Sequence, residues 1–426
     1  MKHHSPFNRS ACGGLAILIC SVLFLLGCTS KADTETPPPA KIEKPKPPMA
    51  VPMWLGNPTR TFFGTGPMPK TLKVYWDFKT SSTRGRLHPD PWGGSGWPGQ
   101  PAIVGDRVYF GSADSYVYCV NKNDGSEIWK FKTTDSAKSS PCVVGDRLVI
   151  GNLDHTVYCL NANDGSFVWK YQTGFETDSS SSIIGDRVYL GGEDHFYYCF
   201  DLKDGKIIFK TQLGGSVEGG TTVVDDRIYV DTEAGDLLCL DRNDGSIIWK
   251  SHLGSTDSNS TPAVVNGFVY TAAEDGIIRS YQADTGELVW TYKAEGGLNQ
   301  KTKEKNGFWA SPIVSNGRLY IGCNSGYLYC LSADKGELIW RHLVRAAIWG
   351  TSPVVDDRVV FGDKSGYIYE LNADNGDLVC ELKIGDNVDA TPAVLDGRVY
   401  VGAFNGKFYC LGEDEAANKQ DPSPTK

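Results

Sequence analysis

The chain has 426 residues, a formal net charge of −9 and an isoelectric point near 5.4. Binding to a phosphate backbone requires clustered lysine and arginine, so this charge balance argues against nucleic acid as a partner. The sequence contains 48 Gly, 20 Tyr and 11 Trp but only 4 Met, which suits tight turns and flat aromatic packing within one large core.

The first 27 residues have the features of an export signal. Lys2 and Arg9 precede the apolar run ACGGLAILICSVLFLLG, which is shorter than a membrane-spanning helix requires. We therefore assign residues 1–27 to a signal peptide, and we expect the protein to be exported.

The signal ends in LLGC, which resembles the lipobox of bacterial lipoproteins. The resemblance implies cleavage before Cys28 and attachment of lipid to its sulfur, whereas the alternative is an ordinary signal peptide with an incidental cysteine. An Asp after the lipidated cysteine usually retains a lipoprotein in the inner membrane of Gram-negative bacteria, and Thr29 stands there. We therefore expect anchoring in the outer membrane, with the protein on the periplasmic face.

Residues 28–52 are predicted to be a flexible tether. The stretch ADTETPPPAKIEKPKPP is rich in proline and charge, so it cannot bury a core and favours extended conformations. Such a tether would let the domain that follows stand away from the lipid.

From here the chain repeats itself about every 40 residues. LNANDGSFVWK at 160–170 is followed by FDLKDGKIIFK and LDRNDGSIIWK, and each repeat contains four β-branched or aromatic segments separated by turn residues. Four antiparallel strands per repeat is the unit of a β-propeller blade. The fourth strand carries an aromatic residue at Trp76, Trp129, Trp169, Phe209, Trp249, Trp290 and Trp340.

Counting the strands predicts how the ring closes. The third strand occurs eight times, but no fourth strand follows Cys410, and the unaccompanied segment WDFKT at 76–80 resembles the fourth-strand segment WKFKT at 129–133. Joining this N-terminal strand to the last three strands closes an eight-bladed ring and leaves no open sheet at its ends. The prediction is an all-β, eight-bladed propeller of four-stranded antiparallel blades over residues 53–413, with a disordered tail at 414–426.

The repeats resemble the PQQ-like (pyrroloquinoline quinone-like) repeat over about residues 70–413. The resemblance implies that each fourth-strand tryptophan docks on a turn of the adjacent blade. Phe209 and Cys380 depart from the pattern, which leaves the contacts beside those two blades open. Six of the cysteines occupy one equivalent third-strand position in separate blades, where they are too far apart to pair, so we expect buried thiols and no metal site.

Two groups of PQQ-like proteins differ in function. Quinoprotein dehydrogenases bind pyrroloquinoline quinone and calcium at the mouth of the ring, and several carry adjacent cysteines, which this chain lacks. Eight-bladed outer-membrane lipoproteins serve the β-barrel assembly machinery as scaffolds, and the lipobox, tether and compact length match this group. The resemblance implies a monomeric scaffold, not an enzyme, with envelope proteins as partners and no cofactor. The alternatives are a quinone-dependent or other small-molecule enzyme and a sensor or carbohydrate-binding module.

Candidate binding residues lie just before the first strand of each blade, where the repeats differ most. In a propeller this segment lines one mouth of the central channel, so its side chains should converge; the alternative is a solvated rim. Aromatic residues beside charges are typical of recognition sites. The candidates are Trp97, Lys138, Asp178, Glu218, Asn259, Trp309, Trp349 and Asp389.

Overall fold

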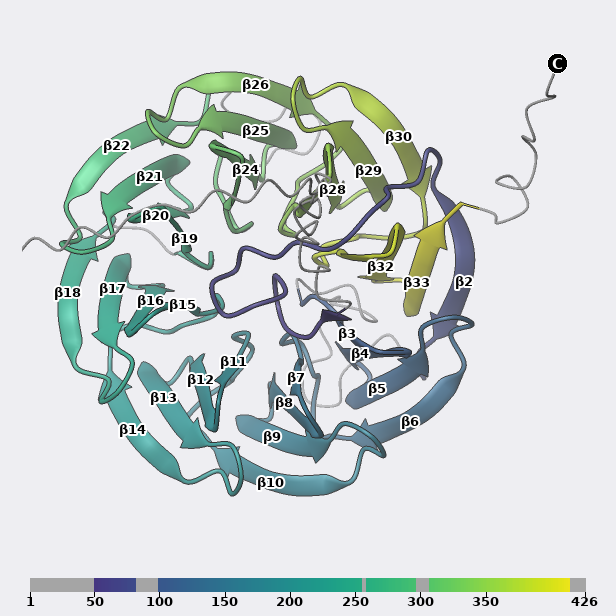
Figure 1. Cartoon of the computed structure of the whole chain (residues 1–426), viewed down its shortest axis with the longest axis vertical. Helices are drawn as coiled ribbons and strands as arrows, with labels where there is room; N and C mark the ends of the chain where they lie inside the picture. The colour runs from purple at the N-terminus through teal and green to yellow at the C-terminus, as the bar shows by residue number, and fades with distance from the viewer. Residues whose placement is uncertain (1–49, 82–98, 255–257, 296–305, 414–426) are drawn as a thin grey trace, which may run out of the picture. The chain divides into compact units, whose positions relative to one another are not determined.

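The computed structural model describes residues 50–81, 99–254, 258–295 and 306–413. The strands of these residues form eight antiparallel sheets arranged around a central axis (Figure 1). The described residues contain no helix that is long and apolar enough to cross a membrane. The predicted all-β, eight-bladed propeller is therefore confirmed.

Seven blades have four strands in chain order from the channel outward, with β1 added to the sheet of the first, and the eighth takes its outer strand from the N-terminal part of the chain. Blade 1 contains β3 (Ala102–Val104), β4 (Arg107–Ser112), β5 (Tyr116–Asn121) and β6 (Glu127–Lys132), and blade 2 contains β7 (Cys142–Val144), β8 (Arg147–Asn152), β9 (Thr156–Asn161) and β10 (Phe167–Gln172). Blade 3 contains β11 (Ser182–Ile184), β12 (Arg187–Gly191), β13 (Phe196–Asp201) and β14 (Ile207–Gln212), and blade 4 contains β15 (Thr222–Val224), β16 (Arg227–Thr232), β17 (Asp236–Asp241) and β18 (Ile247–His252).

The second half of the ring continues the series. Blade 5 contains β19 (Ala263–Val265), β20 (Phe268–Ala272), β21 (Ile277–Gln282) and β22 (Leu288–Lys293), and blade 6 contains β23 (Ile313–Ser315), β24 (Arg318–Gly322), β25 (Tyr327–Ser332) and β26 (Leu338–Leu343). Blade 7 contains β27 (Val354–Val355), β28 (Arg358–Gly362), β29 (Tyr367–Asn372) and β30 (Leu378–Lys383), and blade 8 contains β31 (Ala393–Leu395), β32 (Arg398–Ala403), β33 (Lys407–Gly412) and β2 (Lys73–Lys79).

The last blade combines both ends of the described chain. β2 pairs antiparallel with β33, with Trp76 opposite Cys410 and Lys79 opposite Lys407. In Figure 1 the purple β2 lies beside the yellow β33 on the rim of the ring. The sheet order is β2-β33-β32-β31, so the N-terminal strand is the outer strand of the blade that the C-terminal strands begin.

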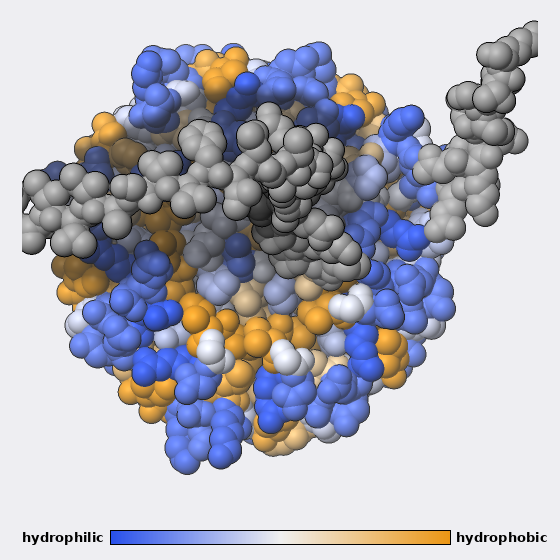
Figure 2. Space-filling model, in the orientation of Figure 1, coloured by the Kyte–Doolittle hydropathy of each residue, from blue (hydrophilic) through white to orange (hydrophobic). Residues whose placement is uncertain are grey.

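Burial within each blade follows from its place in the ring. The second and third strands are covered on both faces by neighbouring blades, so runs such as VYC in β5 are wholly buried. The outer strands alternate, and in β6 only Trp129 is buried. Outer strands also expose aliphatic residues next to the turn that precedes them, such as Ile247 and Ile248. Figure 2 shows a hydrophilic rim interrupted by such hydrophobic patches.

Each outer-strand tryptophan packs on the turn of the next blade. The Trp129 ring covers Gly165, where an added Cβ would lie 2.6 Å from a ring carbon, and its Nε1 donates to the Ala162 carbonyl at 3.1 Å. Trp76, Trp169, Trp249, Trp290 and Trp340 donate in the same way to Lys122, Leu202, Ala283, Ala333 and Ala373. Phe209 keeps the ring contact with Gly245, and Thr211 donates to the Gly245 carbonyl at 2.7 Å.

The exception at Cys380 has a topological cause. The docking turn joins the third and fourth strands of the neighbouring blade, but in blade 8 these strands come from opposite ends of the chain, so no turn joins them. A tryptophan at position 380 would therefore have no turn glycine to cover. Cys380 instead pairs with Glu370 across β30 and β29, and it is among the nine free cysteines of the described residues.

Residues 50–72 form an N-terminal strap across one end of the channel (Figure 1), which the sequence analysis did not foresee. The strap begins with β1 (Ala50–Val51), which pairs with β3, so regular structure starts before the predicted boundary at 53. The Pro52 carbonyl accepts from the Val143 amide in blade 2, and the Pro58 carbonyl accepts from the Val223 amide in blade 4. The strap thus connects blades that do not touch one another directly.

Arg60 fixes the centre of the strap. Its guanidinium is 2% exposed and donates to the Thr221 carbonyl at 2.9 Å, to Ser182 Oγ at 2.8 Å and to the Trp54 carbonyl. Burial lowers the pKa of Arg60 to about 10, which leaves it protonated at neutral pH. The planar guanidinium suits this set of acceptors because its N–H groups point in fixed directions.

Two glycine substitutions separate the tryptophan contact from backbone strain. Gly145 and Gly165 both have positive φ, at +60° and +73°, but only Gly165 has a ring against it. Gly145→Ala should cost about 1 kcal/mol of unfolding free energy through strain alone. Gly165→Ala should cost about 2 kcal/mol more because the new methyl group displaces Trp129. Equal losses in denaturant melts would show that the ring contact contributes nothing.

Arg60→Ala should lower the free energy of unfolding by about 3 kcal/mol, because it leaves buried carbonyl groups without their charged donor. Arg60→Lys should recover only part of the loss, since a single ammonium cannot reach all three acceptors. The exposed neighbour Thr61 provides the matched control, and Thr61→Ala should be close to neutral. Denaturant titration measures all three variants; a neutral Arg60→Ala would contradict an anchoring role.

Candidate binding site at the channel mouth

A pocket lies at the mouth of the channel, where the connections between blades converge. Its volume is about 70 Å³, and the strap residue Trp54 forms part of its lining. Six of the eight predicted residues line it, one from each of six successive connections: Lys138, Asp178, Glu218, Asn259, Trp309 and Trp349. These six positions therefore lie together, as equivalent positions of a closed ring should. The pocket that they line is called the mouth pocket.

Two predicted residues are not part of the mouth pocket. Trp97 lies outside the described residues. Asp389 was wrongly expected to face the opening, since it is completely buried. The amides of Ser311 and Thr351 bond to the hydroxyl groups of Thr351 and Thr391, which makes Trp349 the residue equivalent to Asp389. Trp349 lines the pocket, whereas Asp389 is enclosed in the packing between its connection and Gly350, where an added Cβ would lie 2.8 Å from the Asp389 carbonyl oxygen.

The wall of the mouth pocket is a series of hydrogen bonds between blades. The Gly220 amide donates to Thr261 Oγ1 at 2.6 Å, the Thr261 amide donates to Ser311 Oγ at 2.8 Å, and the Ser311 amide donates to Thr351 Oγ1 at 3.1 Å. Most repeats carry Ser or Thr at this position in the sequence, but the sequence-based prediction did not include these hydroxyl groups. This series holds the side chains on either side of it in fixed positions.

The aromatic part of the pocket is a stacked pair. The rings of Trp309 and Trp349 lie 4.2 Å apart at 27°, and Lys364 Nζ lies 3.3 Å from the centre of the Trp349 ring. Trp309 Nε1 donates to Glu274. Trp349 is only 8% exposed, whereas Trp309 is partly exposed, so Trp309 offers the larger aromatic surface to a ligand.

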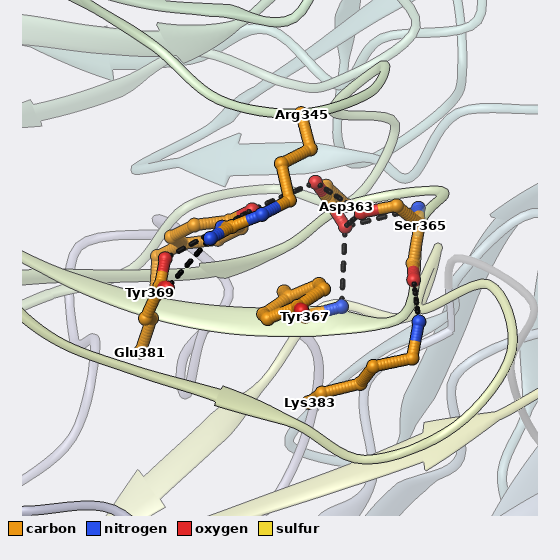
Figure 3. Close-up of polar contacts among 7 residues, drawn as sticks. All are labelled: Arg345, Asp363, Ser365, Tyr367, Tyr369, Glu381 and Lys383. Carbon is orange, nitrogen blue, oxygen red and sulfur yellow. Dashed lines mark hydrogen bonds and ion pairs between the residues drawn. The ribbon is translucent and has the colours of Figure 1, made fainter.

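A polar network in blade 7 holds the connection that carries Trp349 (Figure 3). Arg345 lies on this connection and forms a two-pronged ion pair with Glu381 at 2.6 and 2.7 Å. The same guanidinium donates to the hydroxyl of Tyr369, which in turn donates to the buried Asp363 at 3.0 Å. Charge-assisted, two-pronged contacts of this kind restrict direction as well as distance.

The acidic part of the pocket consists of carboxyl groups in pairs. Burial raises the pKa of Glu193 to about 9 and that of Glu218 to about 10. Glu193 hydrogen-bonds to Asp178, whose own pKa is raised by burial to about 6, and Glu218 hydrogen-bonds to Glu233. At neutral pH, Glu193 and Glu218 are therefore protonated, and each donates a hydrogen bond to its partner. The sequence analysis missed Glu193 and Glu233, which lie on loops between second and third strands.

The charges of the mouth are unbalanced. Lys138 lies near Asp178 and lowers its pKa, opposing the effect of burial, whereas Glu193, Glu218 and Glu233 add three more carboxyl groups to the same cluster. Two of them stay neutral only by keeping a proton, so a bound cation would be stabilised here. Within the described residues, no three His, Cys, Asp or Glu side chains form a group that could hold a metal ion. The arrangement suits the cationic end of an organic group.

The paired acids predict how stability depends on pH. A carboxyl group with a raised pKa binds its proton more tightly in the folded state, so its stabilising effect is complete below the unfolded value and is lost as the pH rises towards the folded one. This pH window runs from about 4.5 to about 9 for Glu193 and from about 4.5 to about 10 for Glu218. The melting temperature should therefore fall by several degrees between pH 6 and pH 8.5.

The double variant Glu193→Gln, Glu218→Gln should lose much of this dependence, because an amide keeps a donor without titrating. Asp124→Asn changes a fully exposed carboxyl group and serves as the control. Calorimetry at a series of pH values makes the comparison. If the melting temperature of the parent protein rises between pH 6 and pH 8.5, the raised pKa values of Glu193 and Glu218 are contradicted.

Comparison with known proteins gives a family and a fold. The family model described as outer membrane protein assembly factor BamB matches residues 70–213, 197–347 and 295–420. Among curated proteins, no sequence matches the chain.

Solved structures share the architecture at low sequence identity. BamB from Moraxella catarrhalis is 16% identical with a TM-score of 0.65, covering 80% of this chain and all of the other. A europium-containing methanol dehydrogenase is 14% identical with a TM-score of 0.71, covering 86% and 99%. The computationally designed Ika8 protein is 14% identical with a TM-score of 0.67, covering 80% and 100%. At such identities the likeness extends to the fold alone.

Proposed function

Because the chain belongs to the family of the outer membrane protein assembly factor BamB, we propose that it is a protein-binding scaffold. It is anchored by lipid at Cys28 to the outer membrane, on the periplasmic face, and it takes part in the assembly of outer-membrane proteins. The lipobox and the proline-rich segment support this location. The fold alone does not distinguish a scaffold from a dehydrogenase, so the choice between them rests on the properties of the mouth pocket.

The size of the mouth pocket is the deciding observation. Sites for small molecules and cofactors typically enclose about 300 Å³ or more, whereas this pocket measures about 70 Å³. That volume suits the end of one side chain. The strap residue Trp54 forms part of the pocket lining and is itself buried, as is the neighbouring Leu55, so the strap takes up space in the channel that a larger molecule would need.

The chemistry of the lining indicates what the partner presents. Asp178 attracts a positive charge, and Glu193 and Glu218 compensate by giving up a proton when a cation binds. Trp309 supplies aromatic area next to these charges. The partner protein therefore inserts a lysine or arginine from an otherwise apolar loop. Such a contact combines a buried anchor with charges that set its orientation.

The alternative is a quinone-dependent enzyme, which the fold shared with methanol dehydrogenase favours. Pyrroloquinoline quinone is a fused three-ring molecule with several carboxylates, and it does not fit a pocket of about 70 Å³ lined by acidic groups. Calcium would require several oxygen ligands in a ring, and the carboxyl groups of the mouth are engaged with one another. We therefore expect neither cofactor.

The scaffold proposal is tested with Trp309→Ala and the purified β-barrel assembly machinery as the probe. Loss of a partly exposed anchor should weaken binding by about 2 kcal/mol, roughly thirtyfold in Kd, with little change in stability. Phe167→Ala removes a more exposed aromatic side chain from the outer strand β10 and serves as the control. If only Phe167→Ala weakens binding, the outer strands are the binding surface and not the mouth.

The enzyme alternative has its own experiment. Purified protein is mixed with pyrroloquinoline quinone and calcium, dialysed and examined by absorbance. We expect no retained quinone spectrum and no alcohol-dependent dye reduction. A stoichiometric spectrum that disappears in Glu218→Gln would overturn the scaffold proposal in favour of a quinoprotein.

A further inference from the structure

A small residue stands where the second strand faces the next connection in every blade but one. This residue is Gly111, Gly151, Gly191, Gly322, Gly362 or Gly402, and in blade 5 it is Ala272. At Gly111 an added Cβ would lie 2.2 Å from the Ala137 carbonyl oxygen, and at Gly151 it would lie 2.1 Å from that of Thr177. The glycine thus lets the connection approach the sheet directly. Blade 4 carries Asp231 at this position.

Asp231 replaces the direct approach with a set of hydrogen bonds. Its carboxyl group is 1% exposed. Oδ2 accepts from Ser258 Oγ at 3.1 Å, from Ser260 Oγ at 3.1 Å and from the hydroxyl of Thr271. All three donors are buried. Oδ1 has no hydrogen-bond partner among the described residues, so the three hydroxyl groups on Oδ2 supply all of the hydrogen bonds that this buried carboxyl group receives. Losing them would be costly, which restrains the direction of each hydroxyl group.

Two of these donors belong to the connection into blade 5 and flank a residue of the mouth pocket. Successive side chains of an extended segment point to opposite sides. With Ser258 and Ser260 turned towards Asp231, Asn259 between them faces the other way and lines the pocket. The same segment lies against Gly219, whose added Cβ would be 2.3 Å from the Ser260 carbonyl oxygen. Glu218 immediately precedes Gly219 in the chain.

We propose that Asp231 is a positioning residue of the mouth pocket, which binds Ser258 and Ser260 and thereby keeps Asn259 in the pocket wall beside Glu218. The functional half of this inference rests on the proposed role of the mouth in binding a partner, while the structural half stands on the contacts alone. Blade 4 lacks the small residue that its neighbours have at this position, Gly191 and Ala272, and the position of its connection is set by side chains instead. The pocket residue Asn259 is thus specified by a residue that does not line the pocket.

The structural half is tested by hydrogen exchange on the whole protein. Asp231→Ala should make the amides of residues 259–261 exchange at least tenfold faster, and Ser258→Ala with Ser260→Ala should reproduce this change. Asp231→Asn retains an acceptor and the shape of the side chain, so it should restore most of the protection. Thr271→Val removes a donor that lies on β20, outside the connection, and should have the smallest effect. Unchanged exchange in Asp231→Ala would overturn the proposal, whatever the partner.

The functional half is tested by binding to the purified β-barrel assembly machinery. Asn259→Ala and Asp231→Ala should weaken binding by similar factors, and Asp231→Asn should restore it. If Asn259→Ala weakens binding but Asp231→Ala does not, Asp231 does not position the site, and the mouth remains the binding surface. If neither Asn259→Ala nor Trp309→Ala weakens binding, the proposed function fails, and the exchange experiment still decides the role of Asp231.

Discussion

The packing of an aromatic ring on the turn glycine of the next blade is the contact on which the ring depends. A propeller has no core shared by all of its blades, because each blade is covered only by its two neighbours. Seven of the eight blade boundaries use this contact, as with Trp129 on Gly165, and six of them add an indole hydrogen bond. These contacts lie near the outside of the ring, so the residues at its centre are free to differ from blade to blade.

That separation explains how a repetitive fold carries an irregular site. Six connections each place a different side chain in the mouth pocket, with Lys138 before blade 2, Asp178 before blade 3 and Glu218 before blade 4. Hydroxyl groups next to these residues join the blades. The backbone is therefore similar in each connection while the chemistry changes. A binding surface built in this way can be altered one repeat at a time without disturbing the packing that closes the ring.

The repeats made most of the fold predictable, since glycine, tryptophan and strand residues recur with one period and one period makes one blade. The same logic located six mouth residues, because equivalent positions converge in a closed ring. It failed for Asp389, which is buried although the equivalent Trp349 of the preceding connection lines the pocket. It could not predict the strap, which occurs once and whose Arg60 is buried only because the channel supplies acceptors. The pairing of Glu193 with Asp178 likewise depends on the approach of two segments from one blade.

The shared last blade has a consequence for how the molecule is made. β2 ends at Lys79, and the strand it pairs with begins at Lys407, so nearly the whole chain must be synthesised before the first outer strand has a partner. Contacts this distant in sequence carry a large loop-closure entropy and form slowly. Until then β2 is a solitary strand that exposes Trp76, which is buried in the closed ring, and its unpaired edge is of the kind that associates with other chains. A cell producing this protein must keep its amino-terminal strand soluble until synthesis is complete.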